Sequence, residues 1–486
     1  MCDTISAIGR LTPQPIAEVV SEGKMEKLTP QKNQPANSGN SSKKRAIAAL
    51  KTPLGLPSAN LKKLIWAAGI ASLCASCQSP QTPSSSTSSP SPSATTAASP
   101  VAVSSPADPN TLKIVSMLPL TGSSQGQAQT IVNGIKQAID EAKSTACDGK
   151  LKIQFDQFDD ATAATGKWDG AQVTANANKA VADGSVVAVI GHYNSGAAKL
   201  SIPILNQANL AMVSPANTYT GLTKPGKGTP QEPNVYYPNG TRNYARVVPA
   251  DDLQGSVGAK WAKSMGVTKV YILDDQELYG KGLATVFDAT AKEIGLTIVG
   301  SEGIDRQAAD YKALMTKIKA LNPDMIYFGG ITQNNAAQLI KDMRNVGMTA
   351  DTVKFMGPDG TYEKALIDAA GKDAEGIYAT FGGVPPKELT GAGKTWYESY
   401  KKQFNAEPEA YAAYGYESAK VVLAAINKVC KNDRAAIRDA VMATKDFNGV
   451  LGTWSFDANG DTSITTMSGN VVKNGKWEFV TVLKNE

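Results

Sequence analysis

Histidine is nearly absent from this chain, since His192 is the only one among 486 residues. A Ser-His-Asp triad and most zinc sites need histidine side chains in a defined arrangement, so one histidine without a cysteine cluster argues against both. We expect His192 to be a packed residue at the end of a strand. The sequence therefore predicts no metal site, no cofactor and no enzymatic activity.

Cysteine is also scarce, and the five cysteines show no zinc-ligand spacing. Cys74 and Cys77 form a C-x-x-C pair, but the pair lies in an apolar segment and not at a strand–helix junction. Cys147 and Cys430 can form a disulfide in an oxidising compartment. Sequence spacing does not place their Cα atoms, so this pairing stays open.

Excess charge of either sign is missing from most of the chain. The formal net charge is +5, yet residues 1–63 hold 10 Lys and Arg against 4 Asp and Glu, which leaves 39 against 40 in the remainder. Proteins that bind nucleic acid need a basic face to contact phosphates. The near-neutral body therefore predicts no nucleic-acid partner.

The apolar segment at residues 64–73 is too short to span a bilayer, which takes about 20 residues. It follows Lys62 and Lys63 and precedes small residues, an order typical of a secretory signal. Residues 75–77 resemble the end of a bacterial lipoprotein signal with Cys77 as the lipidated residue, although Cys74 stands where such signals usually have leucine. A plain secretory signal and a short core helix are the alternatives.

The segments on both sides of this signal (residues 61–77) have the composition of unfolded chain. Residues 1–60 are rich in Pro, Lys, Asn and Ser and poor in aromatics, which predicts disorder; we also hypothesise that translation starts near Leu61. Residues 78–110 are rich in Ser, Pro, Thr and Ala and are expected to form an extended tether. Together these segments predict a periplasmic protein anchored to the membrane through an N-terminal lipid.

Strand and helix patterns alternate from residue 111 onward. A strand pattern at residues 112–118, for example, precedes a helix with Ile131, Ile135 and Ile139 on one face. Such alternation indicates βαβ units and parallel sheets. Residues 221–245 interrupt it with a Gly- and Pro-rich stretch that we expect to be a long surface loop, and residues 378–384 are expected to be a connection.

The predicted fold class is therefore α/β, with two doubly wound parallel-sheet lobes joined by hinge segments. We expect residues 111–248 and 383–448 to form the first lobe. Residues 249–382 and 449–486 are expected to form the second. Two lobes joined by a few extended segments can open and close around a hinge.

Two short apolar strands of the first lobe end in polar loops. One strand covers residues 186–191 and is followed by Ser195, and the other covers residues 210–214 and is followed by Thr218. Ligands of open α/β sheets lie beyond the carboxyl ends of the strands. We therefore expect these two loops together to hold the carboxylate of a small ligand.

Eight short motifs resemble the type I periplasmic-binding family, in particular its leucine/isoleucine/valine-binding branch and the cyanobacterial type that binds neutral amino acids. They occur in the order expected of that family between about residues 110 and 465. The motifs are Pro-Leu-Thr-Gly at 119–122, Phe-Asp-Asp at 158–160, Val-Ile-Gly-His at 189–192, Val-Ser-Pro-Ala-Asn-Thr at 213–218, Asp-Asp-Gln-Glu-Leu-Tyr-Gly at 274–280, Phe-Gly-Gly at 328–330, Phe-Met-Gly-Pro-Asp-Gly at 355–360 and residues 452–461.

The resemblance implies that each lobe grips one charged end of an amino acid. By motif, Ser195 and Thr218 bind the carboxylate, because hydroxyl and N–H donors form charge-assisted bonds to an anion. The backbone carbonyl of Ala216 and the carboxylate of Asp359 bind the ammonium, and Tyr279 covers the ligand. The residues implied to line the side-chain pocket are Gln127, Tyr193 and Tyr411.

The resemblance further implies a monomer that captures a neutral or hydrophobic amino acid and delivers it to an ABC permease. The chain departs from the branched-chain binders at Asn194, Ile331 and Asp359, where those relatives have cysteine, an aromatic residue and glutamate. The resemblance therefore implies that this chain binds the carboxylate and the ammonium of an amino acid. It does not imply a preference for branched-chain amino acids. The alternatives are a binder of urea or short amides, which lack a carboxylate, and a ligand sensor for a membrane receptor.

Overall fold

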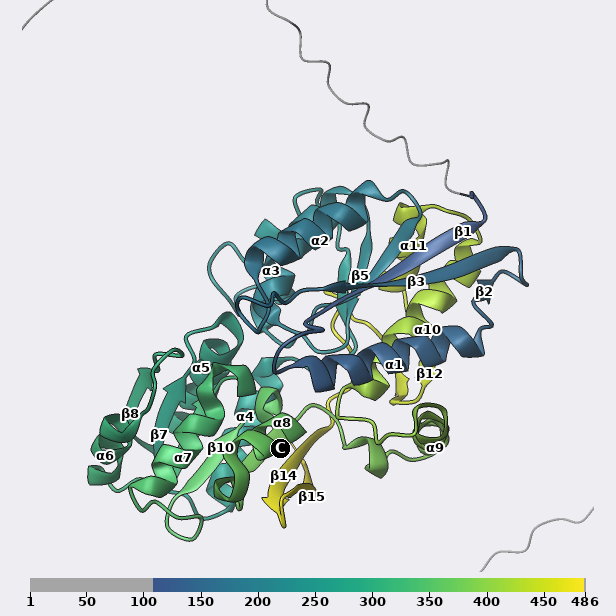
Figure 1. The fold of residues 1–486 in the computed structure, drawn as a ribbon. Helices are drawn as coiled ribbons and strands as arrows, with labels where there is room; N and C mark the ends of the chain where they lie inside the picture. The colour runs from purple at the N-terminus through teal and green to yellow at the C-terminus, as the bar shows by residue number, and fades with distance from the viewer. Residues whose placement is uncertain (1–107, 485–486) are drawn as a thin grey trace, which may run out of the picture. The chain divides into compact units, whose positions relative to one another are not determined.

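The computed structural model describes residues 108–484, which form two α/β lobes, each built on one sheet (Figure 1). The predictions for residues 1–60, for the signal at 61–77 with Cys77, and for most of the tether at 78–110 lie outside the described residues. Among residues 108–484, no helix has both the length and the apolar character needed to cross a membrane.

The first lobe is built on a six-stranded sheet. In spatial order its strands are β2 (Thr145–Ala146), β3 (Leu151–Asp159), β1 (Thr111–Leu118), β4 (Val186–Gly191), β5 (Ala211–Ser214) and β6 (Tyr244–Arg246). All neighbours are parallel except the short β2. Every residue of β4 is buried, as expected of a mainly β-branched strand that is covered on both faces.

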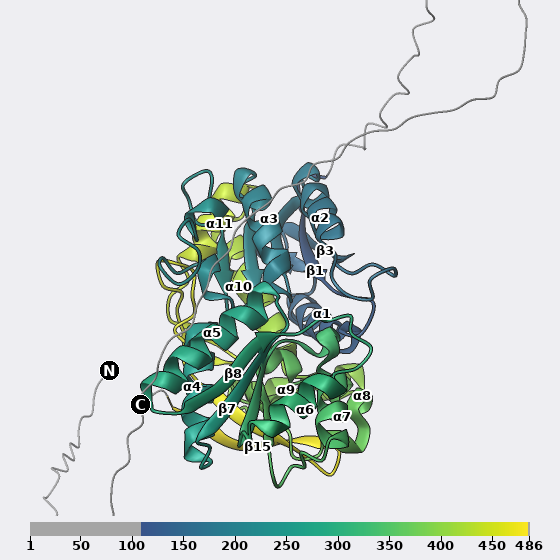
Figure 2. The ribbon, with the colours of Figure 1, turned by 90° about the vertical axis from the view of Figure 1, so that its left-hand side faces the viewer.

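Helices cover both faces of this sheet. They are α1 (Gln125–Glu141), α2 (Gly170–Ala182), α3 (Ser195–Gln207), α9 (Ala392–Phe404), α10 (Ala412–Val429) and α11 (Arg434–Met442). Strand β1 shows the two faces, since Leu112 and Ile114 pack with α1, α10 and α11, while Val115 and Met117 pack with α2 and α3. Figure 2 shows α10 and α11 beside the N-terminal elements, although more than 200 residues separate them in sequence.

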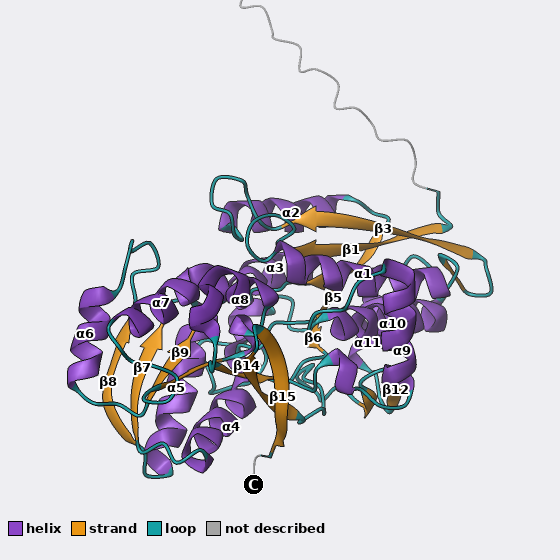
Figure 3. Ribbon diagram, turned by 60° about the horizontal axis from the view of Figure 1, so that its bottom comes forward, coloured by secondary structure: helices purple, strands orange, loops and turns teal. Residues whose placement is uncertain are grey.

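The second lobe is built on a seven-stranded sheet (Figure 3). In spatial order its strands are β15 (Lys476–Leu483), β14 (Met467–Lys473), β11 (Tyr378–Phe381), β10 (Lys354–Gly357), β9 (Met325–Gly329), β7 (Lys269–Asp274) and β8 (Thr297–Gly303). Strands β7 to β11 are parallel, whereas β14 and β15 are antiparallel to their neighbours. The prediction of parallel-sheet lobes is confirmed, with this antiparallel edge as the difference.

Two helix layers also enclose the second sheet. One face carries α4 (Asp251–Ser264) and α5 (Leu278–Glu293), and the other carries α6 (Lys312–Ala320), α7 (Ala337–Asn345) and α8 (Lys364–Ala370). The chain crosses between the lobes after β6, after β11 and again after the small hairpin of β12 (Phe447–Gly449) and β13 (Gly452–Trp454).

Two expectations about irregular segments need correction. Residues 221–245 are not only a surface loop, because Tyr236 and Tyr237 are buried and the segment ends in strand β6. Its interior is organised by the buried carboxylate of Glu232, which accepts hydrogen bonds from Tyr219 and Tyr236. Residues 378–384 do not form a connection alone, because β11 pairs with β10 and β14 within the second sheet.

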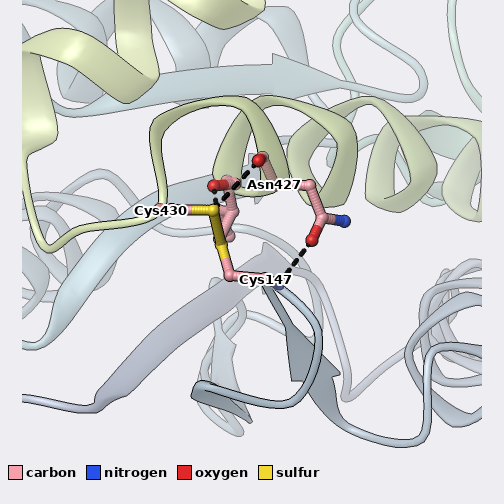
Figure 4. Close-up of a disulfide and its surroundings, with 4 residues drawn as sticks. Cys147, Asn427 and Cys430 are labelled. Atoms are coloured by element: carbon pink, nitrogen blue, oxygen red, sulfur yellow. Dashed lines mark hydrogen bonds between the residues drawn. A yellow bond between two sulfur atoms is a disulfide. The ribbon is translucent and has the colours of Figure 1, made fainter.

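Cys147 and Cys430 form a disulfide in this structure (Figure 4). It joins the turn between β2 and β3 to the residue that follows α10, and the two cysteines are 283 residues apart in sequence. The side chain of Asn427 supports the same junction, since its Oδ1 accepts a hydrogen bond from the backbone N–H of Cys147 at 2.6 Å. The pairing that the sequence left open is therefore present.

Candidate functional site

A cavity lies where the strand ends of the two lobes face each other, and its free volume of about 30 Å³ makes it narrow in this structure. Its lining residues from the first lobe are Trp168, Tyr193, Asn194, Ser195, Gly196, Ala216 and Tyr411. Those from the second lobe are Glu277, Tyr279, Ile331, Asp359 and Gly360.

The topology explains why these residues meet. Tyr193 to Gly196 follow β4 and Ala216 follows β5 in the first sheet. In the second sheet, Tyr279 follows β7, Ile331 follows β9 and Asp359 follows β10. All five positions lie beyond the carboxyl ends of parallel strands, which is where open α/β sheets place ligands.

Ser195 is the first residue of α3 and is only 2 % exposed. Its Oγ accepts the backbone N–H groups of Thr218 and Tyr219 at 3.4 and 3.3 Å, so the loop after β4 is tied to the loop after β5. The Ser195 hydroxyl keeps its own proton to donate. Because α3 has no side-chain cap at Asn194, the positive end of the helix also forms part of the cavity wall.

Thr218 is buried beside the cavity but does not line it, and its Oγ1 has no hydrogen-bond partner in the structure. Its backbone carbonyl accepts the N–H of Asp251 at the start of α4. A buried hydroxyl without a partner is unusual, because leaving it unpaired costs about 1–3 kcal/mol. The Thr218 hydroxyl lies close to the carboxylate of Asp251, so it can donate either to that carboxylate or to a polar group that enters the site.

Asp359 faces the cavity from the second lobe and is 3 % exposed. Tyr279 donates to its Oδ1 at 2.7 Å, and Tyr411, from the first lobe, donates to its Oδ2. Burial raises the pKa of Asp359, and the hydrogen bonds from Tyr411 and Tyr279 oppose that rise. Within the described residues no lysine, arginine or histidine forms an ion pair with Asp359, so the site lacks a cation of its own here.

A second buried acid, Asp251, lies near Asp359, and sequence reasoning missed it. Neither carboxylate oxygen of Asp251 forms a hydrogen bond of normal geometry, although Thr218 is close enough to favour the charged form. Burial, and then repulsion from Asp359, raises the pKa of Asp251 far above its usual range. Two buried carboxylates of the same charge create a place where a cation is favoured.

The three residues expected to line the side-chain pocket have different positions. Tyr193 and Tyr411 line the cavity, with their rings edge to face at 5.9 Å between centroids. Gln127 does not line it. Its side chain is buried behind Tyr411, where Oε1 accepts the Tyr411 backbone N–H at 3.3 Å. The structure therefore places six of the eight predicted residues on the cavity wall, with Thr218 and Gln127 just behind it.

Trp168 and Glu277 also line the cavity and were not among the predicted site residues, although Glu277 lies within the motif at 274–280. A Cβ at Gly196 would lie 2.7 Å from the Trp168 ring, so glycine at 196 lets the indole pack against the start of α3. Glu277 pairs with Arg306, which lies outside the cavity wall. Both positions follow from packing between segments that are far apart in sequence.

His192 lies between Asp160 and Ser201 in the hydrogen-bond order of a Ser-His-Asp triad. Its Nδ1 is 2.5 Å from Asp160 Oδ2, and its Nε2 is 2.7 Å from Ser201 Oγ. All three side chains are 0 % exposed, and none lines the cavity, so no substrate reaches Ser201 in this structure. The prediction that His192 is a packed residue is confirmed, and the cluster anchors the loop that carries Ser195.

Among residues 108–484, no group of three or more histidine, cysteine, aspartate or glutamate side chains has the geometry to hold a metal ion. The loop at Asp457 to Asp461 forms a turn, in which Asp457 Oδ1 accepts the backbone N–H groups of Asn459 and Asp461.

Comparisons with known proteins agree with this geometry. Residues 111–476 match the family model described as periplasmic binding protein. The "Leu/Ile/Val-binding protein homolog 2" of Brucella abortus (strain 2308) is 33% identical over 350 residues, which cover 71% of this chain and 86% of the relative.

Two solved structures are similar over most of their length. A leucine binding protein LivK from Thermotoga maritima MSB8 has a TM-score of 0.67 and 27% identity, covering 76% of this chain and 98% of that chain. The branched-chain amino acid transporter substrate binding protein LivJ from Streptococcus pneumoniae, in complex with isoleucine, has a TM-score of 0.65 and 26% identity, covering 76% and 99%.

Proposed function

This chain belongs to the periplasmic binding protein family, and from that premise we propose that it captures a neutral amino acid outside the cytoplasmic membrane and delivers it to an ABC permease. The main support for the proposal is that hydrogen-bond donors and negative charge lie on opposite sides of the cavity. Hydroxyl and helix N-terminal donors lie on the first-lobe side, and the buried carboxylate of Asp359 lies on the second-lobe side, with Asp251 behind the cavity wall. A zwitterion has the complementary pair of charges.

The first lobe supplies the carboxylate end of the grip. Ser195 Oγ–H and the N-terminus of α3 donate to the ligand carboxylate, and the Thr218 hydroxyl gains the partner that it lacks in the structure. Because Ser195 Oγ already holds the backbone of residues 218 and 219, its position is set before ligand arrives. Preorganised donors lose little entropy on binding, which favours affinity.

The second lobe supplies the ammonium end. Asp359 pairs with the ammonium, Asp251 adds a second negative charge, and the Ala216 carbonyl accepts a further hydrogen bond. Tyr279 covers this end, where its hydroxyl also accepts the backbone N–H of Gly360 at 3.0 Å. An ammonium between Asp251 and Asp359 removes the repulsion that raises the pKa of Asp251.

The lobes close because each lobe binds one charged end of the ligand. Only the closed form brings the carboxylate site and the ammonium site to one ligand, so the ligand binds the closed form more tightly and shifts the equilibrium toward it. The ligand side chain meets a mostly aromatic and aliphatic wall formed by Trp168, Tyr193, Ile331 and Tyr411. This wall favours a neutral side chain.

We infer that the protein acts as a monomer, since one chain supplies both ends of the grip. Residues 61–77 provide the signal, the lipid on Cys77 provides the anchor, and residues 78–110 provide the tether. The Cys147–Cys430 disulfide supports a location in an oxidising compartment outside the cytoplasm.

The test is a thermal-shift screen of the purified chain against the twenty amino acids and urea, followed by calorimetry. A neutral L-amino acid is expected to raise the melting temperature, and its amide and its N-acetyl derivative are expected to bind far more weakly. The amide lacks the carboxylate and the N-acetyl derivative lacks the ammonium. The two derivatives therefore test the carboxylate site and the ammonium site separately. Stabilisation by urea and by no amino acid would contradict the proposal.

A further inference from the structure

Tyr193 and Glu363 form a second contact between the lobes, behind the cavity wall. Tyr193 follows β4 of the first sheet, and its hydroxyl donates to Oε1 of Glu363 at 2.5 Å. Glu363 immediately precedes α8 of the second lobe and is 1 % exposed. Because the two residues belong to different lobes, this bond and the burial of Glu363 depend on the lobes being together.

The surroundings of Glu363 hold no compensating cation among the described residues. Gln333 donates to Oε2 of Glu363 at 3.2 Å, and the next residue, Lys364, pairs with Asp368 instead. The titratable side chains that act on Glu363 are Glu409, which precedes α10, and Tyr193 itself. A carboxyl group in such a place is more stable when it is neutral.

The surroundings fit a protonated Glu363 in the closed protein. Its side chain is buried at the junction of the lobes without a cation among the described residues. This burial raises the pKa of Glu363 to about 8; hydrogen bonds from Tyr193, Thr332 and Gln333 oppose the rise, and Glu409 adds to it.

We propose that Glu363 is a positioning residue that holds Tyr193 against the cavity in the closed protein and takes up one proton from solvent as the lobes close. Amino acid binding is then coupled to proton uptake and weakens as the pH rises. The inference rests on the proposed function, because it requires a ligand that binds the closed form. Glu363 itself does not touch the cavity; it acts through the Tyr193 ring.

The direction of the effect follows from the two states of the carboxyl group. In an open, hydrated cleft the pKa of Glu363 is expected near its ordinary value of 4.5, whereas in the closed protein it is raised to about 8. Closing therefore binds a proton between these values. Affinity is highest near the acidic end of this window and falls by up to about tenfold per pH unit toward its upper end.

Other acids near the site have to be separated from Glu363. Asp359 and Asp251 are expected to interact with the ligand's ammonium, which favours their charged forms in the complex. Any proton that leaves them on binding makes the affinity rise with pH, which is the opposite of the effect expected of Glu363. Glu409 could also take up a proton in this pH range, because burial also raises its pKa. It lies near Lys364 and Asp368. Glu409 makes no hydrogen bond to Tyr193, so it is the matched control.

The experiment measures the Kd of the amino acid found in the screen, by calorimetry between pH 5 and 8, for the full chain and for three variants. Repeating the titrations in buffers of different ionisation enthalpy counts the protons taken up. Glu363→Gln keeps an acceptor for Tyr193 but cannot titrate, so its Kd is expected to be nearly independent of pH. Glu409→Gln is expected to keep the slope and to move the upper end of the window to lower pH. Tyr193→Phe is expected to weaken binding at every pH and to keep the slope.

Equal pH slopes and equal proton uptake in the unmodified protein and in Glu363→Gln would overturn this inference and leave amino acid binding intact. Absence of binding to any amino acid at any pH would overturn the proposed function, and this inference with it. The two failures are therefore distinguishable in one set of titrations.

Discussion

The hydroxyl of Tyr411 donates a hydrogen bond to Oδ2 of Asp359, and this contact joins the start of α10 in the first lobe to the end of β10 in the second. Tyr279 holds the other oxygen of the same carboxylate from within the second lobe. The short side chain of Asp359 is therefore fixed from both sides of the cleft. A tyrosine at position 411 gives this aspartate a donor that a phenylalanine would not.

Tyr411→Phe is expected to weaken amino acid binding. A hydrogen bond to a charged group contributes about 1.5–3 kcal/mol, which corresponds to roughly 10- to 150-fold in Kd. Calorimetry with the amino acid found in the screen measures the effect. Tyr400→Phe is the control, because the Tyr400 hydroxyl contacts the Thr130 carbonyl within the first lobe and should not alter the Kd. Equal losses in the two variants would count against a role for the Tyr411–Asp359 bond.

Asp359→Ala is expected to reduce affinity more severely, because it leaves the ligand's ammonium buried with a weaker partner. Removing one member of a buried charge pair costs about 3–5 kcal/mol, or several hundred-fold or more in Kd. Asp310→Ala removes a carboxylate that pairs with the exposed Lys312 and lies away from the cavity, and it serves as the control. An unchanged Kd for Asp359→Ala would show that the ammonium lies elsewhere.

Ser195→Ala tests the carboxylate end of the grip. The variant loses a donor to the ligand and also the acceptor that holds the N–H groups of Thr218 and Tyr219. Affinity is expected to fall by about 1.5–3 kcal/mol, because hydrogen bonds to charged groups have that strength. Thr174→Ala is a control in the same lobe, since the Thr174 hydroxyl donates to the backbone carbonyl of Gly170 within α2. It should leave the Kd unchanged.

Asp461→Asn is expected to destabilise the fold at neutral pH. The guanidinium of the fully buried Arg246 donates to Asp461 at 2.6 Å and also to the backbone carbonyls of Asn217 and Tyr219. Losing the carboxylate charge leaves Arg246 uncompensated, at a cost of about 3–5 kcal/mol in urea unfolding. Asp457→Asn, in the exposed turn of the same loop, should change stability by about 1 kcal/mol or less.

The same ion pair predicts a pH dependence of stability. Burial alone would raise the pKa of Asp461, but the charge and hydrogen bond of Arg246, together with Lys224 and Thr223, hold this pKa below its ordinary value of 3.8. A group whose pKa is lowered by folding stabilises the folded state above its unfolded pKa. That contribution is lost as the pH falls through the folded pKa. Unfolding curves between pH 2 and 7 should show this loss in the unmodified protein and not in Asp461→Asn.

The sequence predicted the elements of the fold well where hydrophobic period and turn residues agree. Strands β4 and β5, at Val186–Gly191 and Ala211–Ser214, match the expected ranges of 186–191 and 210–214 closely. Asp169 caps α2 by accepting the N–H groups of Ala171 and Gln172, which is a local interaction. The prediction for residues 221–245 was incomplete. The Gly and Pro residues of this segment are a local signal for a loop, whereas the burial of Tyr236 and Glu232 depends on contacts with other segments.

The candidate site was predictable in part for the same reason. Ser195, Ala216 and Asp359 directly follow strands, so the strand pattern alone places them at one edge of each sheet. Asp251, Trp168 and Glu363 carried no such signal. Each obtains its role from a neighbour in another segment, namely Thr218, Gly196 and Tyr193.

What the sequence determined by itself is the order of strands and helices, and with it which loops lie at the ligand-binding edge, because both depend on the local period of apolar residues. Only the tertiary structure decided the contacts between the lobes, Tyr411 with Asp359 and Tyr193 with Glu363. The tertiary structure also places His192 in hydrogen-bond contact with Asp160 and Ser201, away from solvent. These contacts depend on side-chain directions and on how two separately folded sheets face each other, and no local pattern of residues encodes that geometry.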